Sequence, residues 1–93
     1  MVNINGKVML DVSELAAPEP MRAILLQLLD LNEADYLQVV HRKEPTPLYK
    51  KLTEMGFFYY TETDKPMTSY YTISICRQSQ AAQLQRLLGV LSA

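Results

Sequence analysis

Along residues 7–12 every second residue is apolar and points the same way, and this period of two predicts a β-strand with one inward face. The inward set is Val8, Leu10 and Val12, while Met9 and Asp11 point to the other side. From Pro18 to Leu31 apolar residues recur at helical spacing, and the prolines at 18 and 20 fit a first turn, where backbone amides have no intrahelical acceptor. The predicted core face of this helix comprises Met21, Ile24, Leu25, Leu28, Leu29 and Leu31. Leu26 falls on the outer face.

The second half of the chain also predicts strands and helices. Residues 36–42 predict a strand that is apolar on both faces, as in a buried strand. Thr46 offers an N-cap and Pro47 a first helical position, and Gly56 suits a left-handed residue that ends this second helix. Aromatic and β-branched strands follow over 57–62 and 69–77, joined by a turn at 63–67. A third amphipathic helix over 79–91 carries an apolar stripe of Ala81, Leu84, Leu87, Leu88 and Leu91.

The predicted order is β-α-β-α-β-β with an additional C-terminal helix, which is an α+β fold of the two-layer α/β sandwich type. With 93 residues the chain makes one domain, with a core over about 7–77. Two layers leave one face of the sheet without a helix. The C-terminal helix over 79–91 therefore either folds across that face or docks on a second copy, and a homodimer through this helix or a sheet edge is a further hypothesis.

Composition removes several classes of function. An apolar fraction of 48% and a net charge of −1 are typical of a globular domain and leave no broad basic surface for nucleic acid. Cys76 is the one cysteine and His41 the one histidine, so no metal-ligand cluster and no cofactor is predicted. The start of the sequence lacks the pattern of a secretory signal, and no apolar run reaches the ~20 residues of a membrane span. We expect a cytoplasmic protein that does not enter the membrane.

Four short segments carry a family resemblance. They are Leu10-Asp11-Val12, Pro18-Glu19-Pro20, His41-Arg42 and Pro45-Thr46-Pro47-Leu48-Tyr49. Together with the order of elements they resemble the TusA/SirA-like superfamily, and most of all an uncharacterised branch of it, a domain of unknown function. The resemblance implies a TusA-like sandwich whose first two strands are parallel. It also places Ala17 where TusA-like sulfur carriers have the cysteine that receives a persulfide, so that chemistry does not carry over to this position.

If the first two strands are parallel, the loops after them emerge at the same carboxyl edge of the sheet. The candidate binding residues at this edge are Ser13, Glu14, Pro18, Glu19, Pro20, His41, Arg42, Lys43 and Thr46. Two helix N-termini open there, and unpaired amides at such ends suit a small anion. We therefore predict a non-catalytic binding module for a small anionic ligand or a partner protein. The plainer interpretation is that Arg42 and Lys43 only face Glu44 or solvent.

Three alternatives remain open at this point. Cys76 could serve a sulfur carrier or redox protein if its face of the sheet is exposed, whereas a buried Cys76 would be inert. An enzyme could use His41 for proton transfer with Glu14 or Glu19, although no catalytic spacing supports it. Aromatic residues of the hairpin could stack nucleic-acid bases, but Lys65 is the only basic residue in 57–75, which argues against that function.

Overall fold

The computed structural model describes residues 3–63 and 70–89, and it confirms the predicted order of elements. The elements are β1 (Gly6–Asp11), α1 (Glu19–Leu29), β2 (Asp35–His41), α2 (Thr46–Glu54), β3 (Phe57–Thr63), β4 (Tyr71–Arg77), the 3-10 turn η1 (Gln78–Gln80) and α3 (Ala81–Leu87). The fold is therefore α+β, as the hydrophobic pattern predicts.

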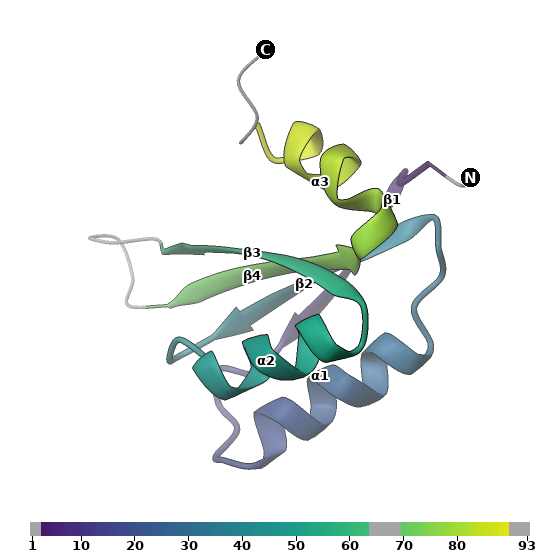
Figure 1. Cartoon of the computed structure of the whole chain (residues 1–93). Coiled ribbons are helices and arrows are strands. Elements are labelled where there is room, and N and C mark those ends of the chain that lie inside the picture. Colours follow the sequence, from purple (N-terminus) through teal and green to yellow (C-terminus); the bar gives the residue numbers. More distant parts are fainter. Residues whose placement is uncertain (1–2, 64–69, 90–93) are drawn as a thin grey trace.

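The four strands form one mixed sheet in the order β1-β2-β4-β3. β1 runs parallel to β2, with Gly6 opposite Asp35 and Asp11 opposite Val40, whereas β4 is antiparallel to both β2 and β3. Figure 1 shows α1 and α2 side by side on one face of the sheet and α3 on the other. The parallel pair that the resemblance implies is thus present.

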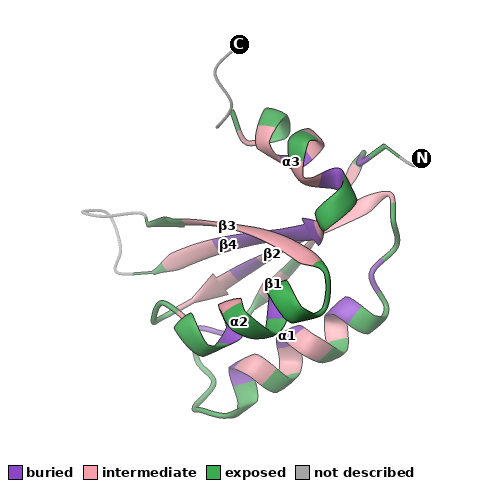
Figure 2. Cartoon of the chain, viewed as in Figure 1, coloured by how far each residue is buried: buried purple, intermediate pink, exposed green. Residues whose placement is uncertain are grey.

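The main core lies between the sheet and the two helices α1 and α2. Its buried members are Val12, Ile24, Leu28, Leu31, Leu37, Val39, Leu48, Leu52, Ile73 and Ile75. Figure 2 shows this buried material along the middle of β2 and β4. An aromatic pair extends the core toward β3, because Tyr49 of α2 stacks on Tyr59 with ring centroids 4.3 Å apart. The Tyr49 hydroxyl also lies 2.6 Å from Thr61 Oγ1, which ties α2 to the edge strand.

A second, smaller cluster fills the opposite face near one end of the sheet. It consists of Ile4, Cys76 and Leu84, with Tyr36, Phe58 and Leu88 packed around it. Two hydrogen bonds hold α3 in place. The Gln80 side-chain amide donates to the Glu33 carbonyl at 2.7 Å, and the Ile4 backbone amide donates to Gln83 Oε1 at 2.8 Å. The C-terminal helix therefore folds onto its own sheet, which answers the question that the sequence leaves open.

The predicted burial in the core is wrong for two leucines. Leu29 is 74% exposed because, at about 100° per residue, it shares the solvent side of α1 with Arg22, seven residues earlier. Leu87 is 56% exposed because the helix α3 meets the sheet mainly through Leu84. The exposed position of Leu26, by contrast, is confirmed at 59%.

Element boundaries also differ from the prediction in the second half. The third helix begins with the 3-10 turn η1, and Tyr70 precedes β4 instead of belonging to it. Of the turn predicted at 63–67, Thr63 belongs to β3 instead, and 64–67 lie outside the described residues, as does the predicted helical residue Leu91.

Of the two predictions for the ends of α2, the one for its start is wrong and the one for its end is confirmed. Pro45, with φ −86°, is the N-cap, and Thr46 is already helical without a side-chain capping bond, so the predicted Thr46 cap is wrong. The ring of Pro45 holds φ near the helical value, which lets the helix begin one residue earlier. Gly56 is confirmed as the left-handed terminator, with φ 83° and its amide 3.2 Å from the Thr53 carbonyl oxygen.

Candidate functional site

The carboxyl ends of β1 and β2 lie at the same edge of the sheet, and the two loops that follow them border a cavity of about 380 Å³. We call this cavity the edge pocket. Its lining residues come from the two Pro-x-Pro segments, the helices that follow them and the end of β2: Leu15, Ala17, Pro18, Pro20, Met21, Ile24, His41, Arg42, Lys43, Glu44, Pro45, Pro47 and Leu48. Segments about 25 residues apart in the chain thus form one site.

The edge pocket has an apolar floor and a charged rim. Ile24 and Leu48 are fully buried at its base, and Pro20 is buried beside them. Arg42 and Lys43 are exposed at the mouth. Among residues 3–63 and 70–89 neither of them forms an ion pair with Glu44 or another residue, so of the two partners in the plainer interpretation the structure shows solvent. Such a pocket suits a molecule with an apolar body and an anionic end.

His41 lies between the floor and the rim of the edge pocket, and the hydrogen bond at one of its ring nitrogens is defined. Its Nδ1 accepts the backbone amide of Lys43 at 3.1 Å. Partial burial lowers the pKa of His41, and the positive charges of Arg42 and Lys43 lower it further. The ring is therefore neutral near pH 7, with its proton on Nε2. Nε2–H is then the donor that His41 has left for a ligand.

The backbone amides of the two helix starts do not form the anion site that the sequence suggests. The amides of Glu19, Thr46 and Leu48 are paired with the carbonyls of Ala16, Glu44 and Pro45 at 2.9, 3.0 and 2.9 Å. Pro20 and Pro47 have no amide proton to offer. Turn-type hydrogen bonds and prolines thus use up most of these donors, and an anion here would depend on the side chains of residues 41–43.

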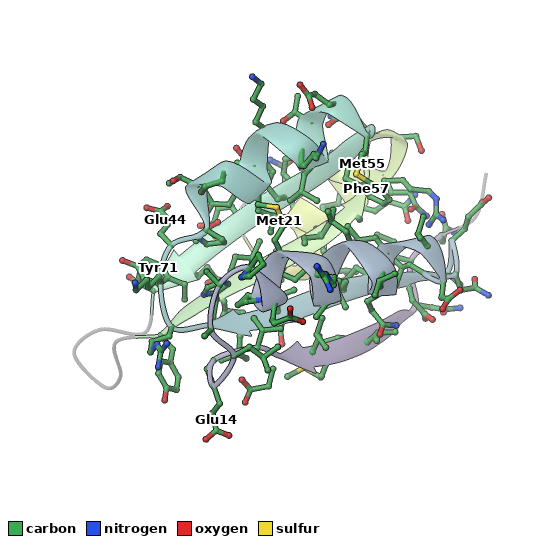
Figure 3. All side chains as sticks on the ribbon, turned by 90° about the horizontal axis from the view of Figure 1, so that it is seen from below. Glu14, Met21, Glu44, Met55, Phe57 and Tyr71 are labelled. Atoms are coloured by element: carbon green, nitrogen blue, oxygen red, sulfur yellow. The ribbon has the colours of Figure 1, made fainter. Side chains whose placement is uncertain are left out.

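Four of the predicted site residues do not line the edge pocket. Ser13 is buried and turns back on Asp11, whose Oδ1 accepts the Ser13 hydroxyl at 2.6 Å and its amide at 2.9 Å. These two bonds lower the pKa of Asp11 and close the loop after β1. Figure 3 shows Glu14 pointing outward, far from Met21.

The other two lie on the outer surface of their helices. Glu19 is exposed and lies 3.8 Å from Arg22 on the solvent side of α1. Thr46 is exposed at the start of α2. The enzyme hypothesis, which pairs His41 with Glu14 or Glu19, therefore gains no carboxylate from either residue within the pocket.

Reasoning from the sequence missed the apolar floor and one acidic rim residue. The missed lining residues are Leu15, Met21, Ile24, Glu44, Pro45, Pro47 and Leu48, with Ala17 noted there only for its missing thiol. Several of them lie inside or next to the Pro-x-Pro segments. These segments were the sequence signal that could have identified them. Glu44 is held at the rim because its Oε2 accepts the Tyr49 hydroxyl at 3.3 Å. Since that hydroxyl has one proton, Thr61 is the donor in the Tyr49–Thr61 contact.

Cys76 lies on the opposite face, beneath α3. The residue is 0% exposed, and burial raises the pKa of its thiol to about 11. A thiol in this state is a weak nucleophile at neutral pH. The alternative of sulfur or redox chemistry at Cys76 thus finds no accessible thiolate.

The aromatic residues of the hairpin do not share one surface. Tyr59 and Tyr71 pack toward the main core, whereas Phe58 belongs to the cluster under α3. A platform for stacked bases needs aromatic rings on one accessible face. The nucleic-acid interpretation therefore gains no support from the described strands.

Within the part of the chain that the structure describes, no three His, Cys, Asp or Glu side chains come together as metal ligands. In the same residues no helix has the length and apolar character needed to span a membrane.

A sequence model of a family of uncharacterized conserved proteins, DUF2249, matches residues 9–76. The chain belongs to the DUF2249 family. The DUF2249 match begins within β1 and ends at Cys76 in β4, so it includes both loops of the edge pocket and stops before η1 and α3. No curated protein and no solved structure matches the chain significantly.

Proposed function

We propose that this DUF2249 domain is a non-catalytic binding module that holds a small amphipathic anion in the edge pocket. One observation carries the proposal: a single cavity joins a buried apolar floor to the basic and imidazole side chains of residues 41–43. At about 380 Å³ the cavity lies at the small end of the range for ligand sites, roughly 300–1,000 Å³. A short-chain carboxylic acid has the matching size and chemistry.

Each end of such a ligand has a physical reason to bind. Burying methylene groups against the accessible apolar lining, which includes Leu15, Pro18 and Met21, contributes about 0.8 kcal/mol per CH₂. The carboxylate faces Arg42 and Lys43 and can accept from His41 Nε2–H, because the backbone amides of Glu19, Thr46 and Leu48 are already paired. The lining residues include no hydroxyl and no thiol, so the pocket holds no serine-, threonine- or cysteine-type nucleophile.

The first experiment compares straight-chain carboxylates from acetate to octanoate by isothermal titration calorimetry, with inorganic phosphate and sulfate alongside. We expect affinity to rise about fourfold per added CH₂ until the cavity is full, because each step contributes about 0.8 kcal/mol. The neutral amide of the same chain length should bind at least about tenfold more weakly, since it loses the charge-assisted contacts.

A pair of charge-matched variants tests the position of the site. Arg42→Ala with Lys43→Ala should weaken octanoate at least about tenfold, since charge-assisted hydrogen bonds are worth about 1.5–3 kcal/mol each. Lys50→Ala with Lys51→Ala removes the same charge from exposed positions of α2 and should leave binding unchanged. Equal losses in both variants, or no binding of any carboxylate, would contradict the proposal.

We propose in addition that the scaffold is TusA-like and has lost its sulfur-carrying cysteine at Ala17. The supporting observation is that Ala17 lines the edge pocket, whose lining also includes the cations Arg42 and Lys43. In a Cys76→Ala background, Ala17→Cys should have a thiol pKa below the ordinary ~8.5, because nearby positive charge favours the thiolate. Ala16→Cys, exposed but not lining the pocket, is the matched control. Equal pKa values for the two thiols would argue against this origin.

A further inference from the structure

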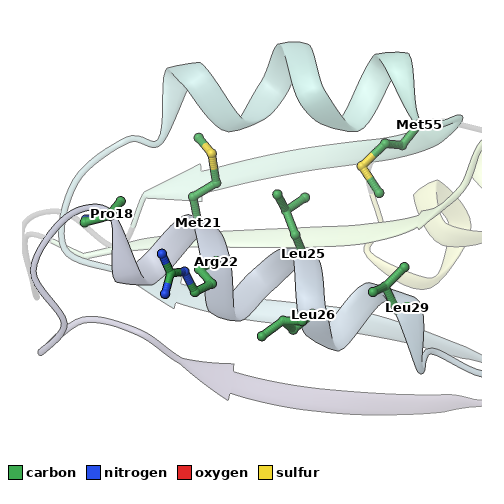
Figure 4. A pocket seen from close by; sticks show the side chains of 7 residues that line it. All are labelled: Pro18, Met21, Arg22, Leu25, Leu26, Leu29 and Met55. Atoms are coloured by element: carbon green, nitrogen blue, oxygen red, sulfur yellow. The ribbon is translucent and has the colours of Figure 1, made fainter.

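A second apolar concavity, of about 390 Å³, lies on the outer surface of the helical layer and shares Pro18 and Met21 with the edge pocket. We call it the α1 groove. Its lining residues are Pro18, Met21, Arg22, Leu25, Leu26, Leu29 and Met55. Figure 4 shows Met21 and Leu25 rising from α1 toward α2, and Met55 reaching back from the end of α2.

The α1 groove has projecting and recessed parts next to each other. Leu29 and Leu26 are 74% and 59% exposed on the outward side of α1, which we call the crest. Met55 is 41% exposed on the other side of the groove. Single exposed leucines are common, but an apolar strip with one charged residue indicates a contact surface. Because crest and recess lie on the same patch, the crest leucines of one copy can enter the recess of another, as a two-fold interface requires.

The charges beside the crest fit the same symmetry. Arg22 and Asp30 both lie four residues from Leu26, in opposite directions along α1, and both are exposed. If two α1 helices pack antiparallel about Leu26, Arg22 of each copy comes level with Asp30 of the other. The only ion pair that Arg22 makes in the described structure is with Glu19 at 3.8 Å, on side chains more than half exposed, and this pair is weak.

We infer that the α1 groove binds a second copy of this chain through an antiparallel α1–α1 contact, with Arg22 facing Asp30 of the other copy twice. The contact is small, because the 11 residues of α1 span only about 16 Å. A standard interface buries roughly 800 Å² on each partner, so we expect this shorter contact to give a weak dimer that forms only at high protein concentration.

Sedimentation equilibrium of the full chain up to about 0.5 mM tests the inference. The mass should approach twice the 10.6 kDa of one chain as concentration rises. Arg22→Asp and Asp30→Arg should each weaken self-association at least about tenfold, because each places like charges together twice. Mixed in equal amounts, the two variants should associate again to within about threefold of the wild type, since every Asp then meets an Arg.

Two controls make the test specific. Arg86→Asp and Glu62→Arg change the net charge by the same amounts at exposed positions of α3 and β3 that do not line the α1 groove, and they should leave the wild-type association unchanged. Leu29→Ser should abolish association while circular dichroism stays native, because Leu29 contributes nothing to the core. A wild type that stays monomeric at 0.5 mM, or mixed charge variants that associate no better than either alone, would overturn the inference.

Discussion

Among residues 3–63 and 70–89, the cluster between the sheet and the helices α1 and α2 has ten buried apolar residues, whereas the cluster between the other face and α3 has three. The strand β4 contributes to both: Ile73 and Ile75 enter the main core, and Ser74 and Cys76 point to the opposite side. The Ser74 hydroxyl is buried without a hydrogen-bond partner among the described residues. The face covered by α1 and α2 therefore supplies most of the stability. The face covered by α3 tolerates the Ser74 hydroxyl as an imperfectly paired polar group.

The edge pocket belongs to the well-packed face, since its floor residues Ile24 and Leu48 are also members of the main core. Cys76, the only thiol, belongs to the lightly packed face. The edge pocket and the thiol thus lie on opposite faces of the sheet, whose buried apolar clusters differ in size. Comparing variants on the two faces tests this division.

The largest effect is expected from Leu48→Ala, which opens a cavity beneath α2 and at the floor of the edge pocket. A fully buried leucine in a well-packed core typically contributes about 2–5 kcal/mol to the free energy of unfolding. Urea denaturation followed by circular dichroism should show a loss of about 3 kcal/mol. A loss below about 1 kcal/mol would mean that the helical face is not the principal core.

An intermediate effect is expected from Leu84→Ala on the other face. We expect a loss near the lower end of the same range, about 2 kcal/mol, because a seven-residue helix can shift to close the gap. Loosening α3 should also expose Cys76, so a thiol reagent should react faster with the native variant than with the wild type.

The matched control for Leu84→Ala lies one turn further along α3. Leu87→Ala removes the same side chain from an exposed position and should change stability by less than about 0.5 kcal/mol. Its Cys76 should react as slowly as that of the wild type. If both variants exposed the thiol equally, α3 would not be the cover of Cys76.

The smallest effect is expected on the pH dependence of stability, through His41. Because the pKa of His41 is lowered in the folded protein, the unfolded chain binds its proton more readily around pH 6.5. The stabilising contribution is therefore complete above pH 6.5 and is lost as pH falls toward the lower folded pKa. The melting temperature should fall between pH 7.5 and 5.5, and the fall should be smaller in His41→Gln. An identical pH profile in the two proteins would contradict the shift.

Local patterns predicted the elements well, as particular residues show. The alternation of Val8 and Leu10 with Met9 defined β1, and Gly56 marked the end of α2 correctly. The patterns failed at Leu29 and Leu87, because periodicity defines an apolar stripe but not how much of that stripe a neighbouring layer covers. Thr46 failed as a cap because the prediction did not weigh the conformational restriction of Pro45.

The candidate site was predicted in part. The two loops and residues 41–43 could be placed together once β1 and β2 were taken as parallel, and the structure brings Pro18, Pro20 and those three residues around one cavity. Ser13, Glu14, Glu19 and Thr46 were included only because they are close in sequence, and their side chains turn elsewhere. The apolar floor was missed because a core residue and a pocket floor have the same sequence pattern.

By itself the sequence determined the order of helices and strands, the α+β class and the absence of a second thiol or histidine, because these follow from local periodicity and composition. Only the tertiary structure decided that α3 covers Cys76, that turn-type hydrogen bonds use the amides at the helix starts, and that Leu26, Leu29 and Met55 share one exposed groove. The physical reason is that burial, hydrogen-bond pairing and exposure depend on which surfaces meet, and contacts between distant segments set those meetings.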